Sequence, residues 1–196
     1  MQEKELRKTP SAFQEGLGVL GFGGPFGMSV RPTPPQVNPQ FRAAYREDSK
    51  VLHKNLRAQL EKTGSSAKIG TDEAKGKTSV ELDTKALFAP GTEGLSAEAQ
   101  QTLSAIGDVL RYVPGKIRIV GFTDNIPLNG TGRRADNMAL SLSRAISVAS
   151  YLHREAHLEA GRIRVAGYGA LKPVADNATA AGRAANRRIQ IDVIQN

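Results

Sequence analysis

The chain has 196 residues and a formal net charge of +8, from 27 basic and 19 acidic residues, and this length fits one domain plus an extension. The absence of cysteine excludes disulfides, thiol catalysis and cysteine zinc sites, and the absence of tryptophan leaves an aliphatic core. No run of about 18 apolar residues predicts a membrane span, and the basic excess favours polyanions without selecting one.

The N-terminal segment is predicted to be a linker. Residues 16–35 carry six glycines and four prolines among twenty, so we expect residues 1–38 to be a flexible segment. Residues 16–21 match the G-x-G-x-x-G pattern. They follow no predicted strand and lead into no predicted helix, so a dinucleotide site is rejected.

Residues 39–67 change in character to an amphipathic helical pattern. The apolar positions of this stripe are Phe41, Tyr45, Leu52, Leu56 and Leu60. Such a helix could lie on a partner helix, on a membrane surface or on its own domain. We favour a connector helix that packs on its own domain.

A compact domain is expected over residues 68–196. Apolar periodicity predicts, in chain order, elements near 80–82 (strand), 96–113 (helix), 117–120 (strand), 137–156 (helix), 163–165 (strand), 181–185 (helical turn) and 189–193 (strand). The order β-α-β-α-β-(α)-β indicates an α/β fold, an α+β sandwich with helices packed on one mixed sheet. In the helix over 137–156, the inward positions are expected to be Leu142, Ala145, Ala149, Leu152 and Ala156.

Nothing in the sequence resembles a catalytic apparatus. His153 and His157 have the i, i+4 spacing of metal ligands, but no third ligand accompanies them, and two solvated histidines are favoured. Asp136 fits a loop cap. We therefore expect no enzyme, no metal and no cofactor.

Charged residues near two predicted element ends are better candidates for binding. Asp124 follows a strand directly, which gives it a rigid platform. Arg144 lies outside the apolar stripe of the next predicted helix. It would be either a surface arginine or a partner of Asp124. Arg187 and Arg188 precede the last strand, and one of them can turn inward to a carboxylate or a carbonyl.

These residues belong to an ordered series of motifs. The series comprises Leu87-Phe88, Gly121-Phe122-Thr123-Asp124-Asn125, Asn137, Leu140-Ser141-x-x-Arg144-Ala145, Gly167-Tyr168-Gly169, Gly182-Arg183 and Asn186-Arg187-Arg188. Over residues 77–194 the series resembles the OmpA-like peptidoglycan-binding domain. Within that family it is most similar to the flagellar stator B subunit (MotB type), through residues 125–128 and the segment 13–20, which resembles a channel plug.

The resemblance implies a non-enzymatic anchor that binds the diaminopimelate-bearing peptide of peptidoglycan. Asp124 maps to the ligand acid and Arg144 to the ligand base, and the remaining implied site positions are Thr123, Asn137 and Arg187, supported by Phe122, Leu140 and Arg183. The family usually has His at the position of Phe122, and the subgroup has Trp at that of Met138. A periplasmic homodimer is implied, with a stator A subunit, a basal-body ring and a membrane helix preceding this chain.

Two other functions stay open. The same domain could anchor an outer-membrane lipoprotein or a secretion system to the wall. A basic nucleic-acid-binding domain is supported by the charge alone, and an aromatic content of 5% argues against it.

Overall fold

A computed structural model describes residues 49–89, 93–128 and 136–195. Its chain divides into two units, residues 1–36 and 37–196, and every described residue belongs to the second. The expected plug-like linker at 1–38 and the first part of the expected connector lie outside the described residues.

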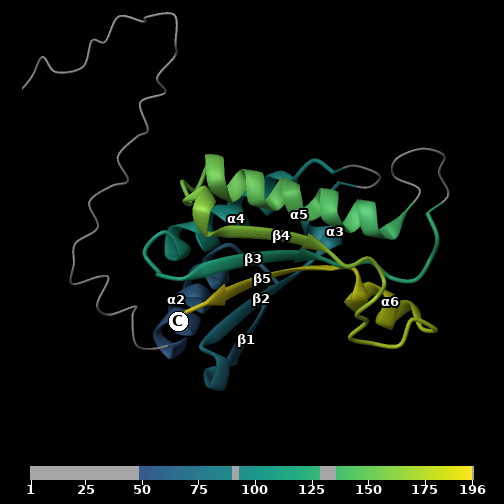
Figure 1. The fold of residues 1–196 in the computed structure, drawn as a ribbon, viewed down its shortest axis with the longest axis horizontal. Helices are drawn as coiled ribbons and strands as arrows, with labels where there is room; N and C mark the ends of the chain where they lie inside the picture. Colours follow the sequence, from purple (N-terminus) through teal and green to yellow (C-terminus); the bar gives the residue numbers. More distant parts are fainter. Residues whose placement is uncertain (1–48, 90–92, 129–135, 196) are drawn as a thin grey trace, which may run out of the picture. The chain divides into compact units, whose positions relative to one another are not determined.

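The second unit is a mixed five-stranded sheet combined with helices. In chain order its elements are α2 (Ser49–Lys62), β1 (Lys68–Asp72), β2 (Lys77–Asp83), α3 (Thr84–Leu87), α4 (Ala97–Leu110), β3 (Lys116–Gly121), α5 (Asn137–Arg154), β4 (Ile163–Gly167), α6 (Ala180–Asn186) and β5 (Arg188–Ile194). The strand order is β1-β2-β5-β3-β4, with β3 and β4 parallel and the other neighbours antiparallel. In Figure 1, α5 runs along β4 and β3, and α6 lies beside the start of β5.

The predicted fold class is confirmed; the strand β1, the helix α3 and two single-turn 3-10 helices, Glu73–Lys75 and Ala160–Arg162, were missed. The β1 segment carries a single apolar side chain, Ile69, so it gives no alternating pattern. It forms because its backbone pairs antiparallel with β2. The four-residue helix α3 is too short for a periodic signal, and it begins where the Asp83 carboxylate accepts a hydrogen bond from the Lys85 amide.

The helix caps were easier to predict. The Ser96 hydroxyl accepts a hydrogen bond from the Ala99 amide at the start of α4, and the Asp136 carboxylate accepts one from the Met138 amide at the start of α5. Asp136 is therefore the cap that the sequence indicated. It fixes the first turn of the helix that carries Arg144.

The core lies between the sheet and the helices. It contains Leu52 and Leu56 of α2, Leu103 of α4 and Ile119 of β3, all fully buried. The described part of the connector therefore packs on its own domain. The expectation that Leu142 faces inward is wrong: this residue is 40% exposed, because α5 packs on the edge strand β4 and no further strand covers that side of the helix.

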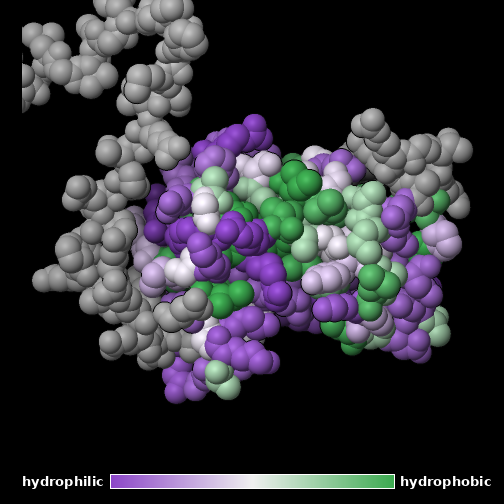
Figure 2. All heavy atoms as spheres, in the orientation of Figure 1, coloured by the Kyte–Doolittle hydropathy of each residue, from purple (hydrophilic) through white to green (hydrophobic). Residues whose placement is uncertain are grey.

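Apolar side chains gather at that edge. Leu142 and Ile146 of α5 and Val165 of β4 are exposed large hydrophobics. Figure 2 shows apolar atoms at the surface where α5 and β4 meet. No helix among the described residues has the length and apolar character that crossing a membrane requires.

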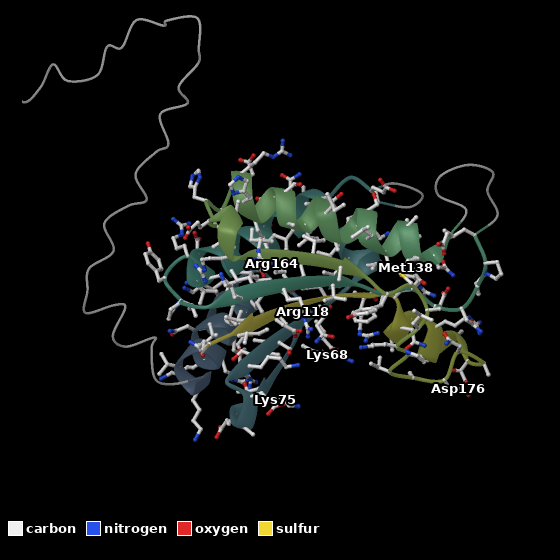
Figure 3. All side chains as sticks on the ribbon, viewed as in Figure 1. Lys68, Lys75, Arg118, Met138, Arg164 and Asp176 are labelled. Carbon is white, nitrogen blue, oxygen red and sulfur yellow. The ribbon has the colours of Figure 1, made fainter. Side chains whose placement is uncertain are left out.

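The opposite sheet face carries a polar cluster around Asp192. The Asp192 carboxylate is fully buried and accepts hydrogen bonds from Ser79, Gln190 and Arg118, at 2.6–3.1 Å. Arg118 is labelled in Figure 3. Burial raises the pKa of Asp192, but these hydrogen bonds and the charge of Lys77 outweigh it, so the net pKa is lowered. The cluster joins the three central strands β2, β5 and β3.

We expect Asp192→Asn to lower the free energy of unfolding at pH 7 by about 2 kcal/mol, because charged hydrogen bonds are lost. A lowered folded-state pKa contributes stability above the unfolded pKa of about 4 and loses it as the pH falls through the folded pKa. Urea unfolding from pH 7 to pH 2 should therefore show a shallower acid loss in Asp192→Asn than in wild type. Asp108→Asn, at an exposed pair with Arg111, is the control; equal slopes for wild type and Asp192→Asn would contradict this account.

Candidate ligand-binding site

Asp124 lies just beyond the end of β3 and is held on both carboxylate oxygens. Its Oδ1 accepts a hydrogen bond from the Ile126 amide at 3.1 Å, and its Oδ2 accepts one from Arg187 at 2.6 Å. The side chain is 11% exposed, so these charges interact with little screening by water. Each carboxylate oxygen keeps a second lone pair for another donor.

Arg144 reaches the same region from α5. Its guanidinium lies 5.4 Å from the centre of the Phe88 ring, and its Nε, buried within the described structure, has no hydrogen-bond partner. Burial lowers the pKa of Arg144; the charges of Glu93 and Asp124 act to raise it, and that of Arg187 to lower it. Arg144 is thus coupled to Asp124 through space, while the ion pair of Asp124 is made with Arg187.

The chain between β3 and α5 is held by side-chain hydrogen bonds to its backbone. Asn137 donates from Nδ2 to the carbonyls of Asp124 and Ile126, at 3.3 and 3.0 Å. The Thr123 hydroxyl donates to the Asp124 carbonyl at 2.9 Å. Asn137 and Thr123 therefore fix the backbone that presents the Asp124 carboxylate.

Two glycines bring α5 close to the sheet at this end. A Cβ built on Gly121 would lie 2.0 Å from the Ser141 carbonyl oxygen, and one on Gly167 would lie 2.5 Å from the Leu142 amide nitrogen. Only glycine permits so close a backbone approach. The Ser141 hydroxyl also accepts a hydrogen bond from the Gly169 amide. The close approach at Gly121 and Gly167 sets the distance between α5, which carries Arg144, and β3, which leads to Asp124.

Two stacked aromatic rings lie between two cations beside the site. The Arg188 guanidinium lies 3.8 Å from the centre of the Phe122 ring, which stacks on Tyr168 at 5.7 Å, and Lys172 lies 4.5 Å from the Tyr168 ring centre. Arg188 also donates to the carbonyls of Asn186 and Lys172. Phe122 is buried and serves as a packing surface for a cation.

The segment before β5 is anchored by Asn186 and Arg183. Asn186 is fully buried and bonds the backbone of Val174 and Ala175, while Arg183 donates to the carbonyls at 177 and 178. Figure 3 shows Met138, at the start of α5, and Asp176, in this segment, at the same end of the molecule. The position of Arg187 beside Asp124 depends on this fixed segment.

The structure brings together most of the residues that the sequence singled out. Asp124, Arg187 and Arg144 interact, and Asn137 and Thr123 hold the backbone between them. Leu140 lies in the first turn of α5, where its amide donates to the Asp136 carbonyl, and Arg183 donates to the carbonyls of the segment before β5.

Sequence reasoning named Arg144 as one alternative partner of Asp124, but the ion pair of Asp124 is made with Arg187. It allowed one of the adjacent arginines to turn toward a carboxylate, and Arg187 does so, while Arg188 turns to carbonyls and to Phe122. It also missed Phe88 as the ring beneath Arg144. The one signal for Phe88 in the sequence was its place in the motif Leu87-Phe88. A contact between a cation and an aromatic ring from distant segments leaves no local sequence pattern.

The two histidines with metal-ligand spacing lie at the surface of the domain. His153 and His157 are exposed, and His153 contacts the Leu158 carbonyl through Nδ1 at 2.8 Å. In the described ranges, no group of three or more His, Asp or Glu side chains could hold a metal ion.

A family model described as the OmpA family matches residues 87–187. This range contains Asp124, Arg144 and Arg187. The chain belongs to the OmpA family. It is an OmpA-like peptidoglycan-binding domain, a class of non-enzymatic anchors.

A curated relative and two solved structures illustrate the range of the family. The outer-membrane lipoprotein YfiB of Pseudomonas aeruginosa is 42% identical over 113 residues, which cover 57% of this chain and 64% of the relative, less than two thirds of its length. The cell wall anchor of the T6SS from the same organism matches with 32% identity and a TM-score of 0.65, over 77% of this chain and 99% of that one. A putative MotB-like protein from Desulfovibrio vulgaris matches with 26% identity and a TM-score of 0.68, over 79% and 96%.

Proposed function

We propose that Asp124 and Arg144 bind the free end of diaminopimelate in the stem peptide of peptidoglycan. That end carries an ammonium and a carboxylate on one carbon. The Asp124 carboxylate suits the ammonium, and the Arg144 guanidinium suits the carboxylate through two parallel hydrogen bonds. The observation that carries this proposal is the buried Nε of Arg144, which has no hydrogen-bond partner among the described residues and feels the charge of Asp124.

The charge of Arg187 explains why Asp124 and Arg144 need not form an ion pair with each other when no ligand is bound. Arg187 already bonds Asp124 at 2.6 Å, so Asp124 does not need Arg144 as a partner. The group of three carries a formal charge of +1, which favours a ligand with more carboxylates than ammonium groups. A stem peptide that contains glutamate and diaminopimelate has that balance.

Co-sedimentation with purified, diaminopimelate-containing peptidoglycan tests the proposal. We expect wild type to pellet with the wall material and the double variant Asp124→Ala, Arg144→Ala to stay in the supernatant, because charged contacts of this kind contribute roughly 1.5–3 kcal/mol each. The matched control removes another Asp–Arg pair, Asp108 and Arg111 on and after α4. Equal pelleting of the wild type and the site double variant would refute the assignment.

For the whole protein we propose a stator anchor of the flagellar motor, working in the periplasm as a homodimer beside a stator A subunit and a basal-body ring. An inner-membrane helix that precedes this chain would hold it. Its support is the likeness to the MotB-like structure and the plug-like pattern at 13–20. A second candidate is the wall anchor of a lipoprotein or a secretion system, favoured by the higher identity to YfiB and to the T6SS anchor.

The residues encoded upstream of this chain distinguish the two machines. A membrane helix with an acidic residue supports the stator, whereas a lipid-modified cysteine supports the lipoprotein. Deletion of the gene in its host gives a second criterion: the stator assignment predicts flagellated cells that do not swim. Normal swimming would reject it and leave the wall-binding proposal intact.

A further inference from the structure

The strand β4 forms one of the two outer edges of the sheet in the part of the chain that the structure describes. The strand order leaves β1 at one edge and β4 at the other. An exposed strand edge carries backbone groups that can pair with another chain. The β1 edge is polar, since Ile69 is its only large apolar residue. The β4 edge combines one charged residue, Arg164, with the apolar Val165, which is 36% exposed.

The backbone of Val165 points to this open edge. The Tyr168 amide donates to the Gly121 carbonyl of β3, at 3.0 Å. Because backbone amides alternate in direction along a strand, the Arg164 amide also points to β3 and the Val165 amide points away from it. The Ile163 carbonyl has the same direction as the Val165 amide, and it accepts a hydrogen bond from the Arg164 guanidinium at 3.0 Å. The Arg164 guanidinium therefore lies at the open edge.

The helical side of this edge is apolar. Leu142 and Ile146 occupy positions i and i+4 on one side of α5, and with Val165 they form a surface that we call the edge patch (Figure 2). A Cβ on Gly167 would lie 2.5 Å from the Leu142 amide nitrogen, so Leu142 lies at the end of β4. Ile146 follows one helical turn later and is 49% exposed. A strand added to β4 would place every second side chain against the edge patch.

The other face of the same edge is basic. Arg118 of β3 and Arg164 of β4 are paired in the sheet (Figure 3), and like charges directly opposite each other are destabilising. The buried Asp192 carboxylate of β5 bonds Arg118 at 2.6 Å. Among the described residues, the Arg164 guanidinium bonds only carbonyls, those of Gly161 and Ile163. A carboxylate on an added strand would lie beside Arg164 as Asp192 lies beside Arg118.

A second copy of this domain fits the edge poorly. If two β4 strands paired antiparallel about Val165, the Arg118 and Arg164 side chains of both copies would lie on one face of the joined sheet. Their mutual repulsion would add to that between two chains of net charge +8. The charges therefore favour an acidic partner over self-association at this edge.

The edge is also separate from the candidate wall site. Arg144 lies two residues from Leu142 and two from Ile146, which turns it about 200° around α5 from both. It therefore leaves the helix on the side away from the edge patch. A partner at β4 and a ligand at Arg144 can be bound at the same time.

We propose that the outer edge of β4 docks an extended segment of a partner protein, in which apolar residues facing the edge patch alternate with acidic residues facing Arg164. Main-chain hydrogen bonds to Val165 would provide affinity, and the alternate side chains would provide specificity. This inference does not rest on the proposed function, since none of the residues that it uses contacts the wall ligand.

Fluorescence anisotropy with two labelled heptapeptides tests the chemistry of the partner. One peptide alternates valine with glutamate, and the other alternates valine with lysine. We expect wild type to bind the glutamate peptide at least about tenfold more tightly, and Arg164→Glu to reverse the preference. Lys68→Glu makes the same charge change on β1, at the opposite edge, and should retain the wild-type preference. The same preference in wild type and Arg164→Glu would overturn the inference.

Amide hydrogen exchange of the wild-type protein locates the contact without any variant. The glutamate peptide should slow exchange of the outward Val165 amide at least about tenfold and should change that of the inward Arg164 amide little. Val165→Pro removes the outward donor, which an edge strand tolerates, and should weaken binding of this peptide. Failure of wild type to bind the glutamate peptide, or protection only outside β4, would also overturn the inference.

Sedimentation of the protein without peptide identifies the other possible occupant. We expect the Val165 amide to exchange at the same rate at low and high protein concentration. If this amide becomes protected as a dimer forms, a second copy covers the edge and the inference is wrong. Binding of peptidoglycan is unaffected by either result.

Discussion

Asp124→Asn should abolish the recognition of the ligand's ammonium group while the backbone around it stays in place. Asparagine keeps an oxygen that can accept the Ile126 amide hydrogen bond, so the turn after β3 is preserved. The charge that would attract the ammonium is lost, and Arg187 is left without its carboxylate partner. Truncating one partner of a buried charge pair costs about 2–5 kcal/mol, so we expect the Kd for a diaminopimelate tripeptide to rise about 30-fold or more.

A change in the ligand makes this experiment specific. In an aminopimelate tripeptide the distal carboxylate remains and the distal ammonium is absent. Wild type should bind this peptide at least about tenfold more weakly than the diaminopimelate form, and Asp124→Asn should bind the two alike. Asp136→Asn, at the cap of α5, is the matched control and should retain the wild-type preference. If Asp124→Asn still prefers the diaminopimelate form, another group recognises the ammonium.

Gly121→Ala should be the most damaging single methyl addition near the site. Its Cβ would lie 2.0 Å from the Ser141 carbonyl oxygen, which is backbone and cannot rotate away. Either β3 or α5 must shift, and we expect a loss of about 3 kcal/mol in the free energy of unfolding, at the upper end of overpacking effects. The shift would also move Arg144 relative to Asp124, so folded protein should bind the tripeptide more weakly.

Gly70→Ala is the control for this change. Gly70 is also a strand glycine, and a Cβ built on it meets nothing within 4 Å. Its replacement should alter the free energy of unfolding by less than about 1 kcal/mol. Urea unfolding of the two variants beside wild type measures the difference, and a Gly121→Ala protein as stable as Gly70→Ala would show that the contact between β3 and α5 is not tight.

Local signals accounted for much of the fold. Ser96 and Asp136 cap the helices that follow them, and alternating apolar residues marked the strands around Val80, Ile119 and Ile191. The β1 strand gave no such signal, because Ile69 is its only large apolar residue. The strand is stabilised by antiparallel pairing with β2, which no local pattern indicates.

At the site, contacts between residues far apart in the sequence could not be predicted either. A strand end and a polar helix position marked Asp124 and Arg144 as candidates, yet periodicity is silent about partners that lie 63 residues apart, as Asp124 and Arg187 do. Leu142 shows a related failure. The helical stripe predicted it to face inward, but α5 packs on β3 and on the edge strand β4, and no further strand covers the side of the helix that carries Leu142.

A crystal structure of the domain with a diaminopimelate tripeptide measures the central claim directly. We expect the distal ammonium within about 3 Å of the Asp124 carboxylate and the distal carboxylate in a two-point contact with Arg144, at the distances of charge-assisted hydrogen bonds. The bond between Arg187 and Asp124 should remain. A tripeptide bound elsewhere on the domain, or bound here with its distal end turned away from Asp124 and Arg144, would contradict the account.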